Sequence, residues 1–475
     1  MDSKNIPLCV DLDGTFIRTD MMMESIALLI LKRPFFLFII PFWLLKGRYY
    51  LKSKLLEYVL PNIKLVPINP KIEEFVISER KKGRYIILVT ASMQEIANQF
   101  KNYYNIFDEA IGSKDDINLV GKTKADYLIN RFGRRGFDYI GDSDKDFYVW
   151  KSANIAHIVN QNERFINRLR EITNIGIVWD LLPKSKFQNF ISEIRTYQWT
   201  KNLLIFLPLI LAHNTNANVY INALLAFFSF SFAASAIYLF NDLMDLDSDR
   251  EHSTKKNRPM AAGNFPIISA FRWILILIIT SLLIALLLHK EFLIVLIMYL
   301  VITLVYSIKL KKIYIIDIVV LSILYTFRLI AGSFSTNIPI SEWLAGFSLF
   351  FFLSMSALKR YVEIKNNLDS DQKAIKGRAY ITDDLQIIQN SGISSGLISV
   401  MIFFLYINSS KVVQLYNSPE ILYLIIPLIV YWILRVWFLA HRGLMNEDPV
   451  LFAIADKRSY LFIISILLIL MFSTL

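Results

Sequence analysis

Hydrophobic and polar positions divide this chain into two parts with different patterns. The N-terminal part alternates short apolar stretches with charged ones, as soluble domains do. Residues 199–475 contain repeated apolar stretches of about 20 residues, the length that an α-helix needs to cross a bilayer. The pattern predicts a soluble domain over 1–185 and a membrane domain over 190–475, joined near Lys184–Arg195.

The membrane domain is predicted to be all-α and polytopic, with about nine transmembrane helices. The expected spans are 199–212, 219–241, 265–287, 291–307, 314–333, 341–358, 388–408, 421–440 and 459–475. The first of these stretches is short for a bilayer crossing.

Lys and Arg are concentrated on alternate loops between these spans. Sixteen of them fall in the loops 242–264, 308–313, 359–387 and 441–458, and two fall in the loops of the opposite side. Because positively charged loops stay in the cytoplasm, this asymmetry places the N-terminal domain and the active sites on the cytoplasmic side. We therefore expect a multi-pass protein of a bacterial inner (plasma) membrane.

Composition agrees with this division. The 475 residues are 55% hydrophobic with a mean hydropathy of +0.44, too apolar for a soluble enzyme of this length. The net charge of +11 is explained by cytosolic loops and anionic lipid, and no nucleic-acid-binding motif accompanies it. The only cysteine, Cys9, excludes an intramolecular disulfide, and the first five residues lack the apolar core of a signal peptide.

An insert in the soluble domain, 26–56, carries an unusual apolar run. The run Pro34–Leu45 is rich in aromatic residues, is flanked by basic residues and is too short to span a membrane. We expect this segment to lie in the membrane interface, facing a lipid-borne substrate. The alternative is the core of an ordinary helical cap.

Two aspartates follow the first apolar strand, in Pro7-Leu-Cys-Val-Asp-Leu-Asp-Gly-Thr15. At a strand end, one of the carboxylates of Asp11 and Asp13 can attack phosphorus while the other handles the leaving-group proton. Gly14 allows the chain to turn sharply directly after them.

Three later motifs carry side chains suited to a phosphate and its metal ion. A second strand ends in Thr90-Ala-Ser92, where a hydroxyl can hold a phosphate oxygen. Lys124 can neutralise the nucleophile and the phosphate, with Lys122 as a weaker competitor. Asp142 and Asp146 follow a further strand and are suited to Mg²⁺.

These four motifs, in this order, resemble those of the haloacid dehalogenase superfamily of phosphatases. The resemblance implies a Rossmann-like α/β domain with Asp11 as nucleophile and Asp13 as acid and base. It also implies that Thr90 and Lys124 hold the phosphate. The Mg²⁺ ligands would be drawn from Asp11, Asp13, Asp142 and Asp146. The alternative is a catalytically inactive regulatory domain.

A second acidic motif lies at the end of a long apolar run, in Tyr238-Leu-Phe-Asn-Asp-Leu-Met-Asp-Leu-Asp-Ser-Asp-Arg250. Asp242, Asp245 and Asp249 follow helical spacing and therefore share one face. Their mutual repulsion would be relieved by Mg²⁺ carrying a diphosphate. The alternative is a solvated helix end at the membrane surface.

This motif resembles the first aspartate-rich motif of the UbiA-type membrane prenyltransferase superfamily, whose members bind a diphosphate through Mg²⁺. The second motif of that superfamily has only one acid here, Asp317, in the stretch Tyr306–Asp317. Arg328 follows about three turns later, and an arginine this far into a span needs a partner or a cavity. An internal salt bridge is the alternative to a substrate-binding role.

The wider pattern resembles the polyprenyl-phosphate phosphoribosyltransferase branch of that superfamily. The motifs are Gln198-Trp-Thr-Lys-Asn202, Asn241–Arg258 with Arg258-Pro-Met-Ala-Ala-Gly263, Tyr306–Asp317, Arg328-Leu-Ile-Ala-Gly332 and Lys359-Arg-Tyr-Val-Glu363. The resemblance implies that phosphoribosyl pyrophosphate is the donor, bound with Mg²⁺ at Asp242, Asp245 and Asp249, and that a polyprenyl phosphate is the acceptor. Substrate-binding residues would include Lys201, Asn241, Arg258, Tyr306, Lys311, Asp317, Arg328, Lys359 and Arg360; Lys309, Lys373, Lys376 and Arg378 are further basic positions.

The expected function is therefore bifunctional: phosphoribosyl transfer to a polyprenyl phosphate, then removal of the 5-phosphate by the N-terminal domain. The partners are the two substrates and the lipid bilayer, with no nucleic acid, and a homo-oligomer is compatible with the sequence. Two other functions remain open. One is UbiA-type prenyl transfer from a prenyl diphosphate to an aromatic or other small acceptor, with a separate phosphatase activity. The other is a non-enzymatic membrane scaffold.

Overall fold

The computed structural model describes residues 6–181, 185–366, 378–409, 412, 416–445 and 448–474. The chain divides into two compact units. The first, here the α/β unit, comprises 1–194 and 238–273; the second, the helical unit, comprises 195–237 and 274–475. The segment 238–273 lies within the predicted membrane domain but packs with the α/β unit. The domain boundaries at 185 and 190 stay a prediction.

The α/β unit is built on a six-stranded sheet in the order β3-β2-β1-β4-β5-β6, with every neighbouring pair parallel. The strands are β1 (Leu8–Val10), β2 (Ile86–Met93), β3 (Glu109–Ser113), β4 (Asp138–Gly141), β5 (Ile155–Val159) and β6 (Asn174–Trp179). The central strand β1 is a continuous apolar run because helices cover both faces of a parallel sheet. The prediction of a Rossmann-like α/β domain is confirmed.

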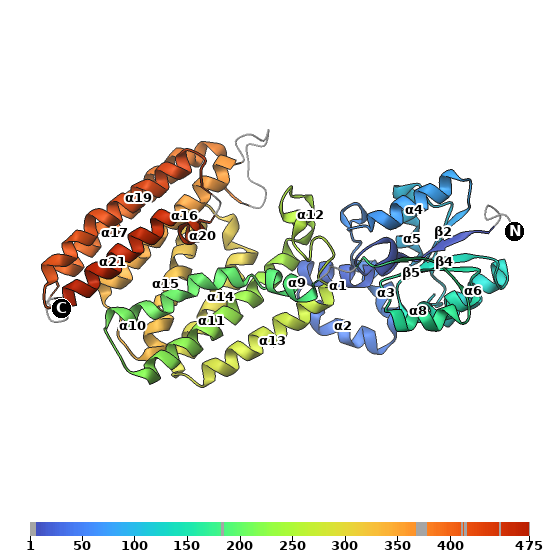
Figure 1. The fold of residues 1–475 in the computed structure, drawn as a ribbon, viewed down its shortest axis with the longest axis horizontal. Coiled ribbons are helices and arrows are strands. Elements are labelled where there is room, and N and C mark those ends of the chain that lie inside the picture. The colour runs from blue at the N-terminus through green and yellow to red at the C-terminus, as the bar shows by residue number, and fades with distance from the viewer. Residues whose placement is uncertain are drawn as a thin grey trace. The chain divides into compact units, whose positions relative to one another are not determined.

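Helices cover the two faces of this sheet (Figure 1). The covering helices are α4 (Pro70–Lys81), α5 (Gln94–Tyr104), α6 (Lys122–Phe132), α7 (Phe147–Ser152) and α8 (Glu163–Arg170). Leu8 and Val10 of β1 pack in one core with residues of α4 and α5. Cys9, which points to the opposite face, packs with residues of α6, α7 and α8. Both faces of the sheet are therefore packed, and the acidic motifs follow its adjacent strands β1 and β4.

The insert between β1 and β2 folds as three helices, α1 (Met21–Lys32), α2 (Phe36–Leu45) and α3 (Arg48–Tyr58). A small core centred on Leu29, Leu51 and Leu55 holds them together. Helix α2 buries none of its residues, and Phe38 and Phe42 are each 67% exposed. This exposed aromatic face differs from the core of an ordinary cap.

The C-terminal part is all-α, as predicted. Seven helical stretches among the described residues are long and apolar enough to cross a membrane: α11 (Ala217–Met244), α13 (Ile267–Leu286), α14 (Lys290–Ile308), α15 (Ile316–Thr336), Thr382–Ile407 with α17 (Leu385–Ile407), Pro419–His441 with α19 (Ile425–His441), and α21 (Lys457–Thr474). The two other predicted spans correspond to α16 (Glu342–Asn366), and to a 3₁₀ helix η5 (Thr196–Phe206) followed by the short α10 (Leu207–Leu211). The predicted number of nine is thus approximate.

Close backbone packing explains one of the sequence motifs of the helical unit. Gly332 of α15 lies against the backbone of Ile205, and a Cβ at this position would overlap the Ile205 carbonyl oxygen. The contact brings α15 against η5, the element that carries Gln198–Asn202. Arg328, one turn earlier on α15, is thereby placed beside Asn202.

Candidate active sites

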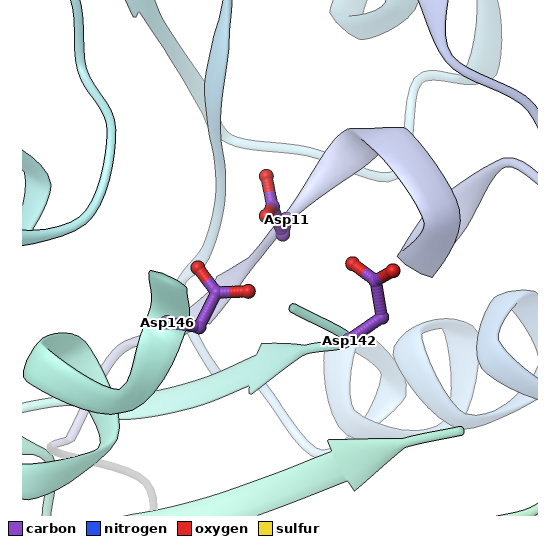
Figure 2. A group of neighbouring side chains, drawn as sticks. All are labelled: Asp11, Asp142 and Asp146. Atoms are coloured by element: carbon purple, nitrogen blue, oxygen red, sulfur yellow. The ribbon is translucent and has the colours of Figure 1, made fainter. Parts of the chain in front are cut away.

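Three aspartates meet at the carboxyl edge of the sheet. Asp11 follows β1, Asp142 follows β4, and Asp146 lies in the short 3₁₀ helix Asp144–Asp146 after β4. Each offers a carboxylate oxygen within 4.8 Å of the other two (Figure 2). β1 and β4 are adjacent parallel strands, so their ends fall at the same edge. The arrangement is suited to one divalent cation, since hard cations prefer carboxylate oxygens.

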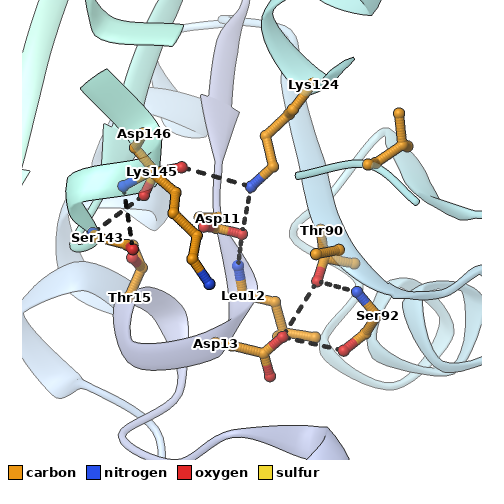
Figure 3. Close-up of polar contacts among 12 residues, drawn as sticks. Asp11, Leu12, Asp13, Thr15, Thr90, Ser92, Lys124, Ser143, Lys145 and Asp146 are labelled. Atoms are coloured by element: carbon orange, nitrogen blue, oxygen red, sulfur yellow. Dashed lines mark hydrogen bonds and ion pairs between the residues drawn. The ribbon is translucent and has the colours of Figure 1, made fainter. Parts of the chain in front are cut away.

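Lys124 supplies the positive charge of this site. Its Nζ lies 2.9 Å from Asp11 Oδ1 and 3.7 Å from Asp146 Oδ1 (Figure 3). It also donates to the Tyr139 hydroxyl at 2.9 Å. The lysine is at the first turn of α6 and is buried, whereas Lys122 is exposed. Lys124, and not its competitor, is therefore the lysine beside the candidate nucleophile.

The turn after β1 requires glycine at position 14. Gly14 has φ +74°, and a Cβ there would overlap the Asp142 carboxylate. Thr15 donates from its hydroxyl to Asp142 Oδ1 at 3.1 Å. The two residues let the loop close over the acidic cluster.

Asp13 lies on the other side of the loop. Its carboxylate accepts from the Met21 backbone N–H at 2.8 Å and from Ser92 Oγ at 3.0 Å, and Thr90 Oγ1 lies 3.5 Å away (Figure 3). These contacts place Asp13 between the insert helix α1 and the end of β2, outside the cluster of three carboxylates. This position suits proton transfer; a role for Asp13 as a metal ligand stays a prediction.

Crowded carboxylates shift the acid–base properties of the site. Burial raises the pKa of Asp11 to about 6 although Lys124 opposes the shift, and burial raises the pKa of Asp13 to about 7 with help from Asp20. The pKa of Asp142 is raised by burial and by the charges of Asp11 and Asp146. Excess negative charge in a buried site fits a divalent cation, which would restore the ionised carboxylates.

A cavity of about 400 Å³ opens on these residues. Besides the predicted residues, its wall includes Lys52 and Arg48 of the insert helix α3, together with Asn118. Motif reading missed these residues because they lie in the insert and in a loop, where no spacing rule points to them.

The second acidic motif spans the end of one helix and the start of the next. Helix α11 ends at Met244, and Asp245 caps the separate helix α12 (Leu246–Glu251). Asp242 and Asp249 are both buried and both bind Arg258 Nη1, at 2.9 and 2.5 Å. One residue, Asp245, separates the two helices, and i→i−4 backbone hydrogen bonds continue on both sides of it, from Asp245 to Asn241 at 2.9 Å and from Asp249 to Asp245 at 2.7 Å. Asp242 and Asp249 share Arg258, and a common face for all three aspartates stays a prediction.

Asn241 gives this motif a feature that fits a ligand. Its Oδ1 is buried and has no hydrogen-bond partner among the described residues. A buried unsatisfied carbonyl is costly, and it is the kind of oxygen that a hard cation or a ribose hydroxyl binds. Two buried carboxylates, Asp242 and Asp249, lie close in sequence, and both are held by Arg258, whose side chain is partly exposed.

In the helical unit, Asp317 of α15 and Arg360 of α16 form a buried ion pair. Tyr306 donates to Asp317 Oδ1 at 2.7 Å, and Arg360 Nη2 donates to the Tyr306 hydroxyl at 3.0 Å. Arg360 Nη1 also binds Glu363, and Arg378 Nη1 lies 3.3 Å from Asp317 Oδ1. The structure thus brings together Tyr306, Asp317, Arg360 and the further basic position Arg378. It adds Glu363, which the sequence motif contained without a role.

Two other predicted cations have protein partners. Arg328 is buried and donates to Asn202 Oδ1 at 2.8 Å and to the Leu324 carbonyl at 2.5 Å, so its partner is an amide in place of the salt bridge considered above. Lys201 binds Asp448 at 2.5 Å. The other basic positions are Lys359, half-buried on α16, Lys311 in the 3₁₀ helix Leu310–Lys312, and Lys309 before it; Lys373 and Lys376 lie outside the described residues.

The fold and these clusters define a class of protein: an α/β domain with a cluster of three carboxylates, on one chain with a polytopic helical domain. Residues 203–466 match the UbiA prenyltransferase family, and the chain belongs to that family. Membership and the apolar helices together make it a multi-pass membrane protein.

Two relatives and one solved structure illustrate the similarity. The chain is 34% identical over 464 residues to the uncharacterized protein y4nM of Sinorhizobium fredii, covering 96% of this chain and 89% of the relative. It is 38% identical over 187 residues to decaprenyl-phosphate phosphoribosyltransferase of Mycobacterium tuberculosis, covering 38% of this chain and 62% of the relative. A phospho-aspartyl intermediate analogue of phosphoserine phosphatase aligns with 37% of this chain and 93% of its own length, at 17% identity and a TM-score of 0.26.

Proposed function

We propose that this chain is a bifunctional membrane enzyme. Its UbiA domain transfers 5-phosphoribose from phosphoribosyl pyrophosphate to a polyprenyl phosphate, and its α/β domain removes the 5-phosphate to give polyprenyl-phosphoryl ribose. The observation that carries the proposal is the presence of two separate acidic sites on one chain, around Asp11 and around Asp242. The similarity to decaprenyl-phosphate phosphoribosyltransferase supports the choice of donor and acceptor.

In the transfer step, an oxygen of the polyprenyl phosphate attacks C1 of the ribose, and the bond from C1 to pyrophosphate breaks. Asp242, Asp245 and Asp249 would hold Mg²⁺, which neutralises the leaving pyrophosphate when bound. Asn241 would bind through its unpaired Oδ1, and Arg258 would exchange its carboxylate partners for phosphate oxygens.

The headgroup of the acceptor needs cations of its own. Each guanidinium nitrogen of Arg360 donates to Asp317, Glu363 or Tyr306. Arg360 would therefore hold this network in place and would not bind the headgroup itself. Lys359 precedes Arg360 in the sequence, and Arg378 contacts Asp317 of the same network. These two cations would bind the prenyl phosphate. Arg328, held by Asn202, would orient η5.

In the phosphatase step, the Asp11 carboxylate attacks the phosphorus of the 5-phosphate and Asp13 protonates the departing ribose oxygen. Water, deprotonated by Asp13, then hydrolyses the aspartyl phosphate to release inorganic phosphate. Lys124 and the hydroxyl of Thr90 would stabilise the charge on the phosphoryl oxygens. Asp11, Asp142 and Asp146 would hold the Mg²⁺ that neutralises the phosphoryl group.

The insert would bring this site to the lipid. Phe35, Phe38 and Phe42 are exposed on α2, and Lys46 and Arg48 follow the helix. An apolar face flanked by basic residues suits the membrane interface. The positive-inside bias supports a bacterial inner membrane with this domain in the cytoplasm.

The test is incubation of the purified full-length protein with radiolabelled phosphoribosyl pyrophosphate, polyprenyl phosphate and Mg²⁺, followed by lipid extraction. We expect label in the lipid fraction and release of both pyrophosphate and inorganic phosphate. If no label enters the lipid with all components present, the proposed transferase function is contradicted. A parallel incubation with a prenyl diphosphate and an aromatic acid tests the prenyl transfer that the family description names. The single acid of the second motif, Asp317, is already paired with Arg360 and argues against that alternative.

A further inference from the structure

Five carboxylates and five cationic side chains line the cavity over Asp11. Lys124 and one divalent cation would act on the transferred phosphoryl group. Two of the other cations, Arg48 and Lys52, belong to the insert helix α3 and not to the sheet. They are therefore available to a part of the substrate other than the transferred phosphoryl group.

Lys52 is the best placed of these cations. It belongs to helix α3 of the insert and is half-buried. Its Nζ donates to the Ala91 carbonyl at 2.6 Å and to Asn118 Oδ1 at 3.2 Å. Since an ammonium group has three N–H donors, these two contacts hold Lys52 beside the end of β2 and leave one donor for a ligand.

Burial disfavours the charged form of the Lys52 side chain. It lowers the pKa of Lys52, and the charges of Asp13 and Asp20 partly offset that effect. A cation held in a partly desolvated wall gains when an anion binds against it. Arg48 lies one helical turn before Lys52 on the same helix and lines the same cavity, so the two can bind one anionic group.

Apolar residues also line the cavity. Met22 and Met23 come from α1, and Pro266, Ile267 and Ile268 come from the segment 238–273 that packs in the α/β unit. The lining therefore combines carboxylates, cations and apolar side chains. A substrate that matches all three carries a phosphomonoester, a second anion and an apolar chain.

We propose that Lys52, with Arg48, forms a second anion subsite that binds the phosphodiester of a lipid-linked sugar phosphate while its monoester lies at Asp11. This inference rests on the proposed function and deepens it, because it names the group that distinguishes the lipid product from free sugar phosphates. The residues of 266–268 would contact the start of the apolar chain.

The experiment compares two soluble substrates with the full-length protein in detergent and Mg²⁺. One is methyl ribofuranoside 5-phosphate, and the other is ribose 5-phosphate with a methyl phosphodiester at C1. They differ in the second anion and lack the lipid. We expect kcat/KM of the wild type to favour the diester by about tenfold, the size of one charge-assisted hydrogen bond. Lys52→Gln should remove most of this preference, and Lys52→Arg should keep most of it.

Lys54→Gln is the matched control, because Lys54 lies on the same helix, pairs with Glu57 and does not line the cavity. It should keep the wild-type preference. Equal kcat/KM for the two substrates in the wild type, or an unchanged preference in Lys52→Gln, would overturn the subsite. If Lys52→Gln does not fold, Arg48→Gln is the second test variant. It should also lower the preference in kcat/KM for the diester. Failure of the wild type to hydrolyse either substrate would overturn the proposed phosphatase itself.

Discussion

Glu24 of the insert helix α1 and Arg250 of α12 form a buried bidentate ion pair, with Oε1–Nη2 at 2.7 Å and Oε2–Nη1 at 3.1 Å. Their side chains are 5% and 4% exposed, and 226 positions separate them in the sequence. The pair joins α12, which carries Asp249, to the insert that lines the cavity over Asp11. Within the α/β unit, one buried ion pair therefore links the second acidic motif to the insert.

The first prediction is that Arg250→Gln destabilises the α/β unit by about 3–5 kcal/mol, because it leaves the Glu24 carboxylate buried and unpaired. The double variant Glu24→Gln/Arg250→Gln should lose less than the sum of the single variants. Urea unfolding can be followed by pulse labelling of Cys9, the only cysteine, which is fully buried in β1. Additive losses in the two single variants would show that the pair contributes no coupling.

The second prediction concerns the transferase metal site. Asp242→Asn should reduce label transfer into lipid by at least about a hundredfold, since one of two buried carboxylates is lost. Hydrolysis of a soluble phosphomonoester should continue. Asp247→Asn is the control, because Asp247 lies in the same motif with a side chain that is 52% exposed. Full lipid labelling by Asp242→Asn would remove this residue from the mechanism.

Sequence reading located the acidic and hydroxyl residues around Asp11 because each lies in or just after the end of a strand. Parallel strands end at one edge of a sheet, so order along the chain was enough to bring Asp11 and Asp142 together. Lys52 reaches the same cavity through the tertiary packing of the insert, which no local spacing encodes.

Helical periodicity did not predict the side-chain contacts of the second acidic motif. Helical spacing grouped Asp242, Asp245 and Asp249, and the structure places Asp245 between the end of α11 and the start of α12. The pairing of Asp242 and Asp249 with Arg258 depends on a loop that returns to the helix, and spacing cannot show such a return. The association of Glu24 with Arg250 is of the same long-range kind.

The third prediction concerns the order of the two reactions. Asp11→Asn should leave transfer intact and stop dephosphorylation, because the nucleophile is lost while a similar shape is kept. The lipid product should then accumulate one phosphate group heavier than the wild-type product, as measured by mass spectrometry. Asp144→Asn, an exposed change in the nearby 3₁₀ helix, should behave as the wild type. Identical lipid products from Asp11→Asn and the wild type would mean that the phosphatase acts on another substrate.

The fourth prediction concerns the exposed face of α2. Replacing Phe38 and Phe42 by Ser should slow dephosphorylation of the lipid several-fold and leave a soluble phosphomonoester almost unaffected, because only the lipid requires approach to the membrane. Trp43 is a poorer choice, since it stacks on Tyr58 at 5.7 Å inside the insert. Tyr103→Ser, a change at an exposed aromatic residue of α5, is the matched control. Equal slowing of both substrates would point to a folding defect in place of a membrane contact.

The last prediction concerns acid stability. His157 of β5 is buried, and its Nδ1 accepts the backbone N–H of Ile177 at 3.1 Å, so folding requires the neutral ring. Burial lowers the pKa of His157 to about 4 from 6.5, although the charge of Asp138 opposes the shift. Between these two values the unfolded chain binds the extra proton, and the stability contributed by neutral His157 is lost as pH falls through that window.

We therefore expect the contribution of His157 to fall by about 2 kcal/mol between pH 7 and pH 5. The raised pKa values of Asp11 and Asp13 act in the opposite direction, so the comparison must be made between variants. His157→Gln, whose side-chain oxygen can accept the Ile177 N–H, should lose less stability on acidification than the wild type. His252→Gln, at an exposed position, should match the wild type. Urea midpoints from Cys9 labelling at a fixed pulse pH measure the difference, and equal acid sensitivity in all three proteins would assign the effect to other groups.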